Sequence, residues 1–329
     1  MGALPKSIAA LIGTATISAV PLLATSTAGA EEPLTPSQVI HTFEDTFDVH
    51  PGQRMNHAGA VCARGSFVGT PAASALSRSR LFAGDPLPVL TRFSVIRGNV
   101  SSSGAREMAL EFRLPDGSLQ HMAMLNTPVL VAAVPLAFNE MIKAVKPDPS
   151  TGEPDQVRLH DFLDSHPDAF AQSNFIAATA STAGYADSSY FSIHSFRFID
   201  AEGRTHFVRW RFIPEDAEKP ATPRALQRGP VRWDMIVYVG DPDDTTDNAT
   251  VAWPESRQHF KAGILTISKV TPGIADDCEK ASFDPLIVAD GIAPSDDPVL
   301  LFRSPTYASA FVGRLSQALG SPPAVVVGR

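Results

Sequence analysis

Residues suited to proton transfer and to anion binding gather in three segments that are far apart in the chain. They are Arg54-Met55-Asn56-His57-Ala58, then Arg92-Phe93-Ser94 with Leu125-Asn126-Thr127-Pro128, and finally Arg303-Ser304-Pro305-Thr306-Tyr307 with Arg314. An imidazole such as that of His57 can take up and return a proton close to neutral pH. The amide of Asn126 can orient a small molecule without adding charge, and the hydroxyl of Ser94 can fix an imidazole tautomer. These residue types suit acid–base chemistry.

Many common catalytic signatures are missing from the sequence. It has no Gly-rich phosphate loop, no Gly-x-Ser-x-Gly turn, no paired-Cys motif and no His-x-x-x-His spacing. Its two cysteines, Cys62 and Cys278, have no second Cys or His at zinc-like spacing, so a zinc site is not expected. An oxidising compartment would allow the two to pair, whereas two separate buried thiols are also compatible with the sequence.

Alternating apolar residues predict that strands position these groups. Between Glu107 and Leu114, the apolar Met108, Leu110 and Phe112 share one face, and a Pro-Asp-Gly-Ser turn follows. The strand candidates are residues 55–68, 90–96, 107–114, 121–133, 194–199, 205–214, 231–239 and 262–270. Eight antiparallel strands suffice to close a barrel and remove its edges. We therefore predict an α+β, mainly β fold built on a closed eight-stranded antiparallel β-barrel.

Helical periods occur in two places. The first covers residues 135–145 and 156–179, as an insertion between the fourth and fifth strands, and the second covers residues 298–319. Asp297 can cap the C-terminal helix, with Pro298 at its first helical position. Pro305 inside that stretch predicts a kink, or a restarted helix with Ser304 as its cap.

The first 30 residues read as a secretory signal peptide. Lys6 is their only charged residue, an apolar run follows it, and Ala28-Gly29-Ala30 precedes two glutamates. A membrane anchor is the alternative, but Thr14, Ser18 and Pro21 interrupt the run, which falls short of the ~20 residues that a span needs. The expected mature protein is exported, soluble and most simply periplasmic.

Composition places the rest of the chain among globular proteins. The 329 residues are 44% hydrophobic and 19% charged, with no linker or repeat that would divide residues 31–329, so we expect a single domain there. The net charge is −8 and no dense Lys/Arg run is present, which gives nucleic acid or an anionic membrane no electrostatic attraction.

Taken together, the three segments resemble the catalase family. His57 corresponds to the family's catalytic histidine, with Arg54 three residues before it, while Ser94 falls on its Arg-Phe-Ser motif and Asn126 on its Asn-Thr-Pro motif. Tyr307 follows Arg303 by four residues and precedes Arg314 by seven, as in the family's proximal segment. Further stretches that resemble the family are residues 192–196, 249–255 and 283–285, so the resemblance covers roughly residues 33–319.

The resemblance implies haem b as the cofactor. His57, Ser94 and Asn126 would be the catalytic residues on the distal side, and Tyr307 would be the iron ligand, its phenolate favoured by the guanidinium of Arg303. Arg54, Arg92 and Arg314 would bind the haem propionates, because guanidinium groups bind carboxylates in a bidentate manner. Phe138, twelve residues beyond Asn126, corresponds to an aromatic residue that contacts the porphyrin.

The sequence is most similar to the compact, exported, catalase-related peroxidases of this family. Such an enzyme would reduce hydrogen peroxide or organic hydroperoxides through an oxo-ferryl intermediate, with small electron donors as partners, as a monomer or small homo-oligomer. Two departures affect peroxide access: Asn56 precedes the histidine where the family has an apolar residue, and Gly104 stands where its channel has an Asp. True catalase activity remains the first alternative, and a non-catalytic haem-binding protein the second.

Overall fold

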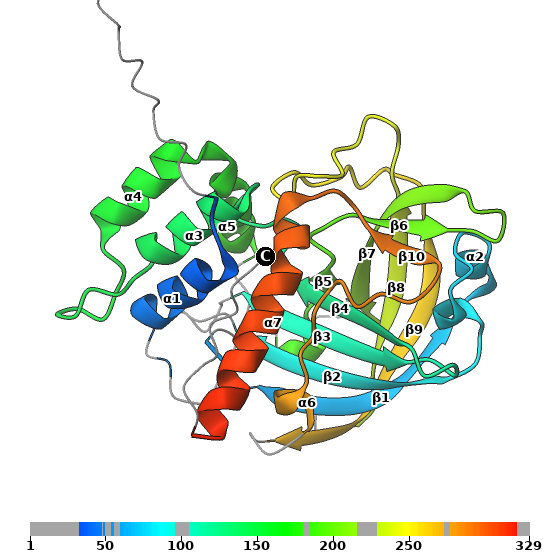
Figure 1. The fold of residues 1–329 in the computed structure, drawn as a ribbon. Helices are drawn as coiled ribbons and strands as arrows, with labels where there is room; N and C mark the ends of the chain where they lie inside the picture. Colours follow the sequence, from blue (N-terminus) through cyan, green and yellow to red (C-terminus); the bar gives the residue numbers. More distant parts are fainter. Residues whose placement is uncertain are drawn as a thin grey trace, which may run out of the picture. The chain divides into compact units, whose positions relative to one another are not determined.

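The structure, a computed structural model, describes residues 33–47, 49, 54–55, 60–95, 105–179, 184–215, 229–272 and 277–320 (Figure 1). Leu34–Arg329 form one compact unit, and Met1–Pro33 form a second. The predicted signal peptide lies outside the described residues, as do His57, Asn56 and Gly104. Their assignments stay predictions.

A closed β-barrel is the centre of the larger unit. Its strands are β1 (Val61–Gly69), β2 (Leu87–Val95), β3 (Arg106–Arg113), β4 (Leu119–Leu125), β5 (Tyr190–Phe191), β7 (Thr205–Pro214), β8 (Val231–Val239) and β9 (His259–Pro272). They pair antiparallel in the order β7-β5-β4-β3-β2-β1-β9-β8, and the pairing of β7 with β8 closes the ring. The predicted eight-stranded antiparallel barrel is confirmed.

One member of the predicted set of barrel strands is wrong. Residues 194–199 were expected in the ring, but the strand formed there, β6 (Phe196–Ile199), pairs with the start of β7 and with β10 (Ile292–Pro294) outside it. The short β5 completes the ring instead, by bonding to β4 and to the second half of β7. Two residues give too short a pattern for periodicity to reveal a strand.

The strands β2 to β4 are buried on both faces. The predicted inner face of β3, with Met108, Leu110 and Phe112, packs in the barrel core. The opposite face carries Glu107 and Ala109, which are also buried, because helices and the segment after β9 cover it. An outer face that is covered in this way can carry a functional site.

The helices are α1 (Pro36–Thr46), α2 (Pro71–Ser74), α3 (Pro135–Ala144), α4 (Gln156–Ser165), α5 (Phe170–Ala178), α6 (Asp277–Lys280) and α7 (Pro298–Ala318), with short 3₁₀ turns at Arg80–Phe82, Pro167–Ala169 and Tyr185–Asp187. The predicted helical insertion is present, divided at Pro167, which cannot donate the backbone hydrogen bond that would continue α4. Helix α1 was not predicted, although Thr35 and Gln38 form a capping box at its start. No helix in the described parts of the chain is long and apolar enough to cross a membrane.

The C-terminal helix α7 runs across the outside of the barrel beside α1 (Figure 1). As predicted, Asp297 caps it, accepting hydrogen bonds from the backbone N–H groups of Val299 and Leu300. Of the two alternatives predicted at Pro305, a restarted helix is wrong, because Pro298–Ala318 is one helix with Pro305 inside it, and the kink stays a prediction. Ser304 does not act as a cap, since its hydroxyl donates to the Asp284 carboxylate at 2.5 Å. The proline side chain is exposed, so its ring is accommodated without a cavity in the core.

Cys62 on β1 and Cys278 on α6 form a disulfide, with their Cα atoms 5.8 Å apart. Both side chains are fully buried, in a cluster with Leu90, Ala109 and Phe283. The sequence left this pairing open, and the structure settles it. The bond ties the segment between β9 and α7 to the outside of the barrel.

Candidate active site

A cavity of about 630 Å³ lies between the outer face of β2 to β4 and the helices α1, α3 and α7. Six residues predicted from the sequence line it: Arg54, Arg92, Phe138, Arg303, Tyr307 and Arg314. They come from four separate parts of the chain: the segment before β1, β2, α3 and α7. Most of the remaining wall is apolar, contributed by aliphatic and aromatic side chains of α1, α3 and α5. Such a mixture of an apolar wall and a few convergent polar groups is typical of a ligand site.

Helix α7 presents Arg303 and Tyr307 to the cavity from successive turns. The guanidinium of Arg303 donates to the Tyr307 hydroxyl at 2.9 Å and lies 5.4 Å from the centre of its ring. Burial alone would lower the pKa of Arg303, but Tyr307, Glu107 and Asp284 together outweigh it and raise that pKa. The guanidinium therefore stays charged beside the phenolic oxygen, an arrangement that stabilises an anionic oxygen.

His194, in the segment between β5 and β6, lies beside Asp297 at the N-terminus of α7 and was given no role from the sequence. Its Nδ1 donates to the Asp297 carboxylate at 2.8 Å, which leaves Nε2 as the unprotonated nitrogen. Nε2 is buried without a hydrogen-bond partner among the described residues, and the ring lines the cavity. Burial lowers the pKa of His194; Asp297 opposes this, while Arg303 and Arg209 add to it. A neutral imidazole is thus held close to the Arg303–Tyr307 pair.

This histidine should make the protein sensitive to acid. Because its pKa is lowered in the folded state from 6.5, its contribution to stability is complete above about pH 6.5 and is lost as the pH falls below that value. The free energy of unfolding should fall by up to about 1.4 kcal/mol per pH unit for each such group. The buried His121, whose pKa is also lowered, should contribute to the same decline. The free energy of unfolding of His194→Gln, measured in urea, should decline less steeply than that of the parent between about pH 7.5 and 5.5.

The exposed His41 offers the matched control, and His41→Gln should decline as the parent does. An equally steep decline in His194→Gln would contradict the assignment of a neutral buried imidazole.

Three arginines form a positive group at another part of the cavity wall. Glu279 accepts from Arg92 at 2.9 and 3.3 Å and lies 3.6 Å from Nε of Arg54. The pKa of Arg54 is lowered to about 10 by burial and by the charges of Arg92 and Arg314, and that of Arg314 is lowered by burial and by Arg92. These guanidiniums repel one another, and Nε of Arg54 is buried without a hydrogen-bond partner in the part of the chain that the structure describes. The group is suited to bind a ligand with negative charges.

Two predicted residues, Ser94 on β2 and Asn126 directly after β4, are not among the residues that line the cavity, and each makes a hydrogen bond to a neighbouring strand residue. The Ser94 hydroxyl donates to the Glu107 carboxylate at 3.0 Å, so its lone pairs remain as acceptors. Asn126 accepts from the backbone N–H of Arg106 at 2.7 Å through its carbonyl oxygen, which leaves its NH₂ group as the donor. Glu107 itself lines the cavity and was not predicted, because strand alternation gave no reason to expect its face to be buried.

Phe138, on α3, lies in the cavity wall opposite the strands. Its ring centre is 6.4 Å from that of Phe43 on α1, and it packs against buried side chains that include Leu125 and Val131. An aromatic ring at this place can cover one face of a flat, apolar ligand.

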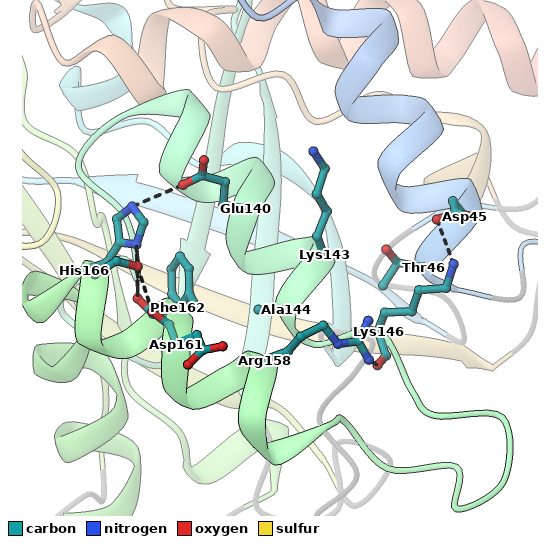
Figure 2. A pocket seen from close by; sticks show the side chains of 11 residues that line it. Asp45, Thr46, Glu140, Lys143, Ala144, Lys146, Arg158, Asp161, Phe162 and His166 are labelled. Carbon is teal, nitrogen blue, oxygen red and sulfur yellow. Dashed lines mark hydrogen bonds and ion pairs between the residues drawn. The ribbon is translucent and has the colours of Figure 1, made fainter.

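A second cavity, of about 690 Å³, lies among α1, α3 and α4 (Figure 2). Two pairs form among its charged side chains: Lys146 binds Asp45 at 2.7 Å, and His166 lies 3.3 Å from Glu140 while stacking on Phe162. Side chains of both charges line this cavity, so its charge favours no one class of ligand. The residues predicted from the sequence line the first cavity.

Comparison with known proteins agrees with the geometry. The catalase family model matches residues 49–228. The chain is 40% identical over 328 residues to the catalase-related peroxidase of Synechococcus elongatus, a match that covers 94% of this chain and 95% of the relative. It is 34% identical to the catalase-related peroxidase of Mycolicibacterium paratuberculosis, across 84% of this chain and 94% of the relative.

Catalases of larger size match less closely. The chain is 26% identical to the catalase of Pseudomonas aeruginosa and spans 59% of its length. Among solved structures, a bacterial catalase superimposes with a TM-score of 0.71 at 21% identity, covering 89% of this chain and 63% of the other. Catalase A from Saccharomyces cerevisiae gives 0.72 at 22% identity, covering 88% and 67%. The barrel, its covering helices and the matched sequence agree, and the chain therefore belongs to the catalase superfamily, grouped with its catalase-related peroxidases.

Proposed function

We propose that the protein is a haem b peroxidase that reduces hydrogen peroxide or organic hydroperoxides with small electron donors. The observation that carries this proposal is one apolar cavity with two polar groups on its wall: the Arg303–Tyr307 pair and the arginines Arg54, Arg92 and Arg314. The 40% identity to a protein named a catalase-related peroxidase supports the same reaction class.

The cavity residues fit haem. A porphyrin is flat and apolar and carries two carboxylates, which matches a wall of apolar side chains that ends in mutually repelling guanidiniums. Tyr307 would supply the iron ligand through its phenolic oxygen, and Arg54, Arg92 and Arg314 would bind the carboxylates. When bound, haem supplies the iron centre at which the peroxide bond is cleaved, and a phenolate suits its oxidised state.

The protein's own groups divide the remaining work. Arg303 holds positive charge next to the Tyr307 oxygen. Because His194 is neutral, it adds no second positive charge beside that guanidinium. His57 would take the proton from the near oxygen of the peroxide and deliver it to the leaving oxygen. Ser94, which donates to Glu107, offers its lone pairs to an imidazole N–H, and the NH₂ group of Asn126 can orient the peroxide.

Two features favour a peroxidase over a true catalase. Rapid dismutation requires a second peroxide to arrive before any other reductant, and a carboxylate in a narrow channel favours that small molecule. The sequence has Gly104 at the position aligned with that carboxylate. The cavity reaches apolar side chains of α4 and α5, Leu159 and Ile176, which suit aromatic donors and larger hydroperoxides.

Oxidation of a phenolic or diazo dye should therefore outrun oxygen release when both are measured at the same low peroxide concentration. A dye assay and an oxygen electrode give the two rates. Gly104→Asp is expected to raise oxygen release relative to dye oxidation, because it restores the aligned carboxylate. Vigorous oxygen release by the parent with negligible dye oxidation would instead identify a true catalase.

Export to an oxidising compartment, most simply the periplasm, completes the proposal. The Cys62–Cys278 disulfide supports it, because such bonds persist in oxidising compartments and are rare in reducing ones. Mass spectrometry of the protein from a cell fraction tests the point: a mature chain that begins near Glu31 would agree with cleavage after Ala30. An uncleaved chain confined to the reducing compartment would contradict it.

A further inference from the structure

Two consecutive residues of helix α6, Cys278 and Glu279, make different kinds of contact. Cys278 is bonded to β1 of the barrel, and Glu279 binds the arginines of the cavity wall. The helix is four residues long, too short to be stable through its own hydrogen bonds. Its position therefore depends on contacts with the barrel, and the disulfide is the covalent one.

Glu279 contacts two of the three arginines in the cavity wall, Arg92 and Arg54. Its two carboxylate oxygens accept from Nε and an NH₂ of Arg92, a bidentate geometry that fixes the plane of the guanidinium. One of the same oxygens lies 3.6 Å from Nε of Arg54. Both arginines are thus aligned by a single carboxylate, and Arg92 is almost completely buried.

The segment that follows Cys278 also holds Arg54 through its backbone. One NH₂ of Arg54 donates to the carbonyl oxygen of Cys278 at 3.5 Å and to that of Ala281. Burial and the like charges of Arg92 and Arg314 act against the charged form of Arg54 at this place, and the carboxylate of Glu279 acts in its favour. A displacement of α6 would move the carboxylate and both carbonyls together, and the two arginines with them.

We propose that Glu279 and the Cys62–Cys278 disulfide are positioning elements for the haem carboxylates: the bond fixes α6, α6 fixes Glu279, and Glu279 aligns Arg92 and Arg54. This inference rests on the proposed haem function. It assigns to the disulfide a task in cofactor retention, in addition to any effect on the unfolded chain.

The test compares haem with its dimethyl ester, in which the two carboxylates are blocked. The protein is loaded with either cofactor, and the rate of cofactor transfer to excess apomyoglobin is measured. Glu279→Gln and the double variant Cys62→Ala/Cys278→Ala should release haem about 10-fold faster or more, as is typical when groups that orient ligand-binding residues are lost. The dimethyl ester should leave the parent and both variants at the same rate, and Glu279→Asp should restore part of the haem retention.

Glu202→Gln is the matched control, because Glu202 pairs with Arg204 at an exposed turn far along the chain from α6. It should retain haem as the parent does. If both variants retain haem as the parent does, the inference is wrong. It is also wrong if both variants release the dimethyl ester faster than the parent by the same factor as haem, since that result would mean a general loss of structure. If the double variant does not fold, Glu279→Gln decides alone. A parent that binds neither cofactor would overturn the proposed function itself, and the inference with it.

Discussion

Tyr307→Phe is expected to abolish the absorption bands of a ferric tyrosinate in the purified protein and to lower its haem content sharply. The substitution removes one oxygen atom, the atom that Arg303 binds at 2.9 Å and that would reach the iron. The ring and its packing on α7 are kept, so the barrel should stay folded. Absorption spectra and a haem-to-protein ratio measure the effect.

Two further variants make the result specific. Tyr238→Phe removes a hydroxyl from the barrel at β8, next to Arg211 and away from the cavity, and should leave the spectrum unchanged. Arg303→Ala should be milder than Tyr307→Phe, because the phenol remains but loses its cation. A Tyr307→Phe protein with the parent's spectrum and haem stoichiometry would show that another residue is the ligand.

His57→Ala should slow the reaction with peroxide by about 100-fold or more, the effect that is typical of a lost general base. Haem content should be preserved, because the groups proposed to hold haem, Tyr307 and the arginines Arg54, Arg92 and Arg314, are unchanged. Stopped-flow spectroscopy of the haem bands after mixing with peroxide gives the rate. Ser94→Ala should slow the same step by less, since the proposed role of its hydroxyl is to orient the imidazole of His57 and not to transfer the proton itself.

The control for His57 is His259→Ala, a histidine on β9 that stacks on Tyr238 outside the cavity. It should react at the parent rate. If His57→Ala also reacts at the parent rate, His57 has no part in the mechanism, and a haem-binding protein without catalysis becomes the better explanation.

Short-range patterns in the sequence predicted much of the fold. Alternation located β3, β7 and β8, and the Asp297-Pro298 pair located the start of α7. The two-residue β5 could not be predicted, because it is held by pairing with β4 and β7 and has no pattern of its own. The effect of Pro305 was also overestimated: a proline on the exposed side of a long helix costs hydrogen bonding but need not end the helix.

Local patterns also explain which residues of the site were predicted and which were missed. Residues with a motif around them, such as Arg54, Arg92 and Tyr307, were predicted and lie on one cavity. Glu107 and Glu279 were missed, because each acts through a neighbour from a distant part of the chain. His194 was missed for the same reason, since its role depends on Asp297, more than a hundred residues later.

The double task of Asp297 sets a limit on how α7 can vary in length. One carboxylate oxygen caps the helix and the other binds His194, so the first turn is fixed in rotation as well as in position. Successive residues of an α-helix are rotated by about 100° around its axis. One residue inserted between Leu300 and Arg303 would leave the cap in place but turn Tyr307 by about that angle, away from the cavity. A single insertion or deletion in this stretch would therefore separate the capped end of α7 from Tyr307, the proposed iron ligand.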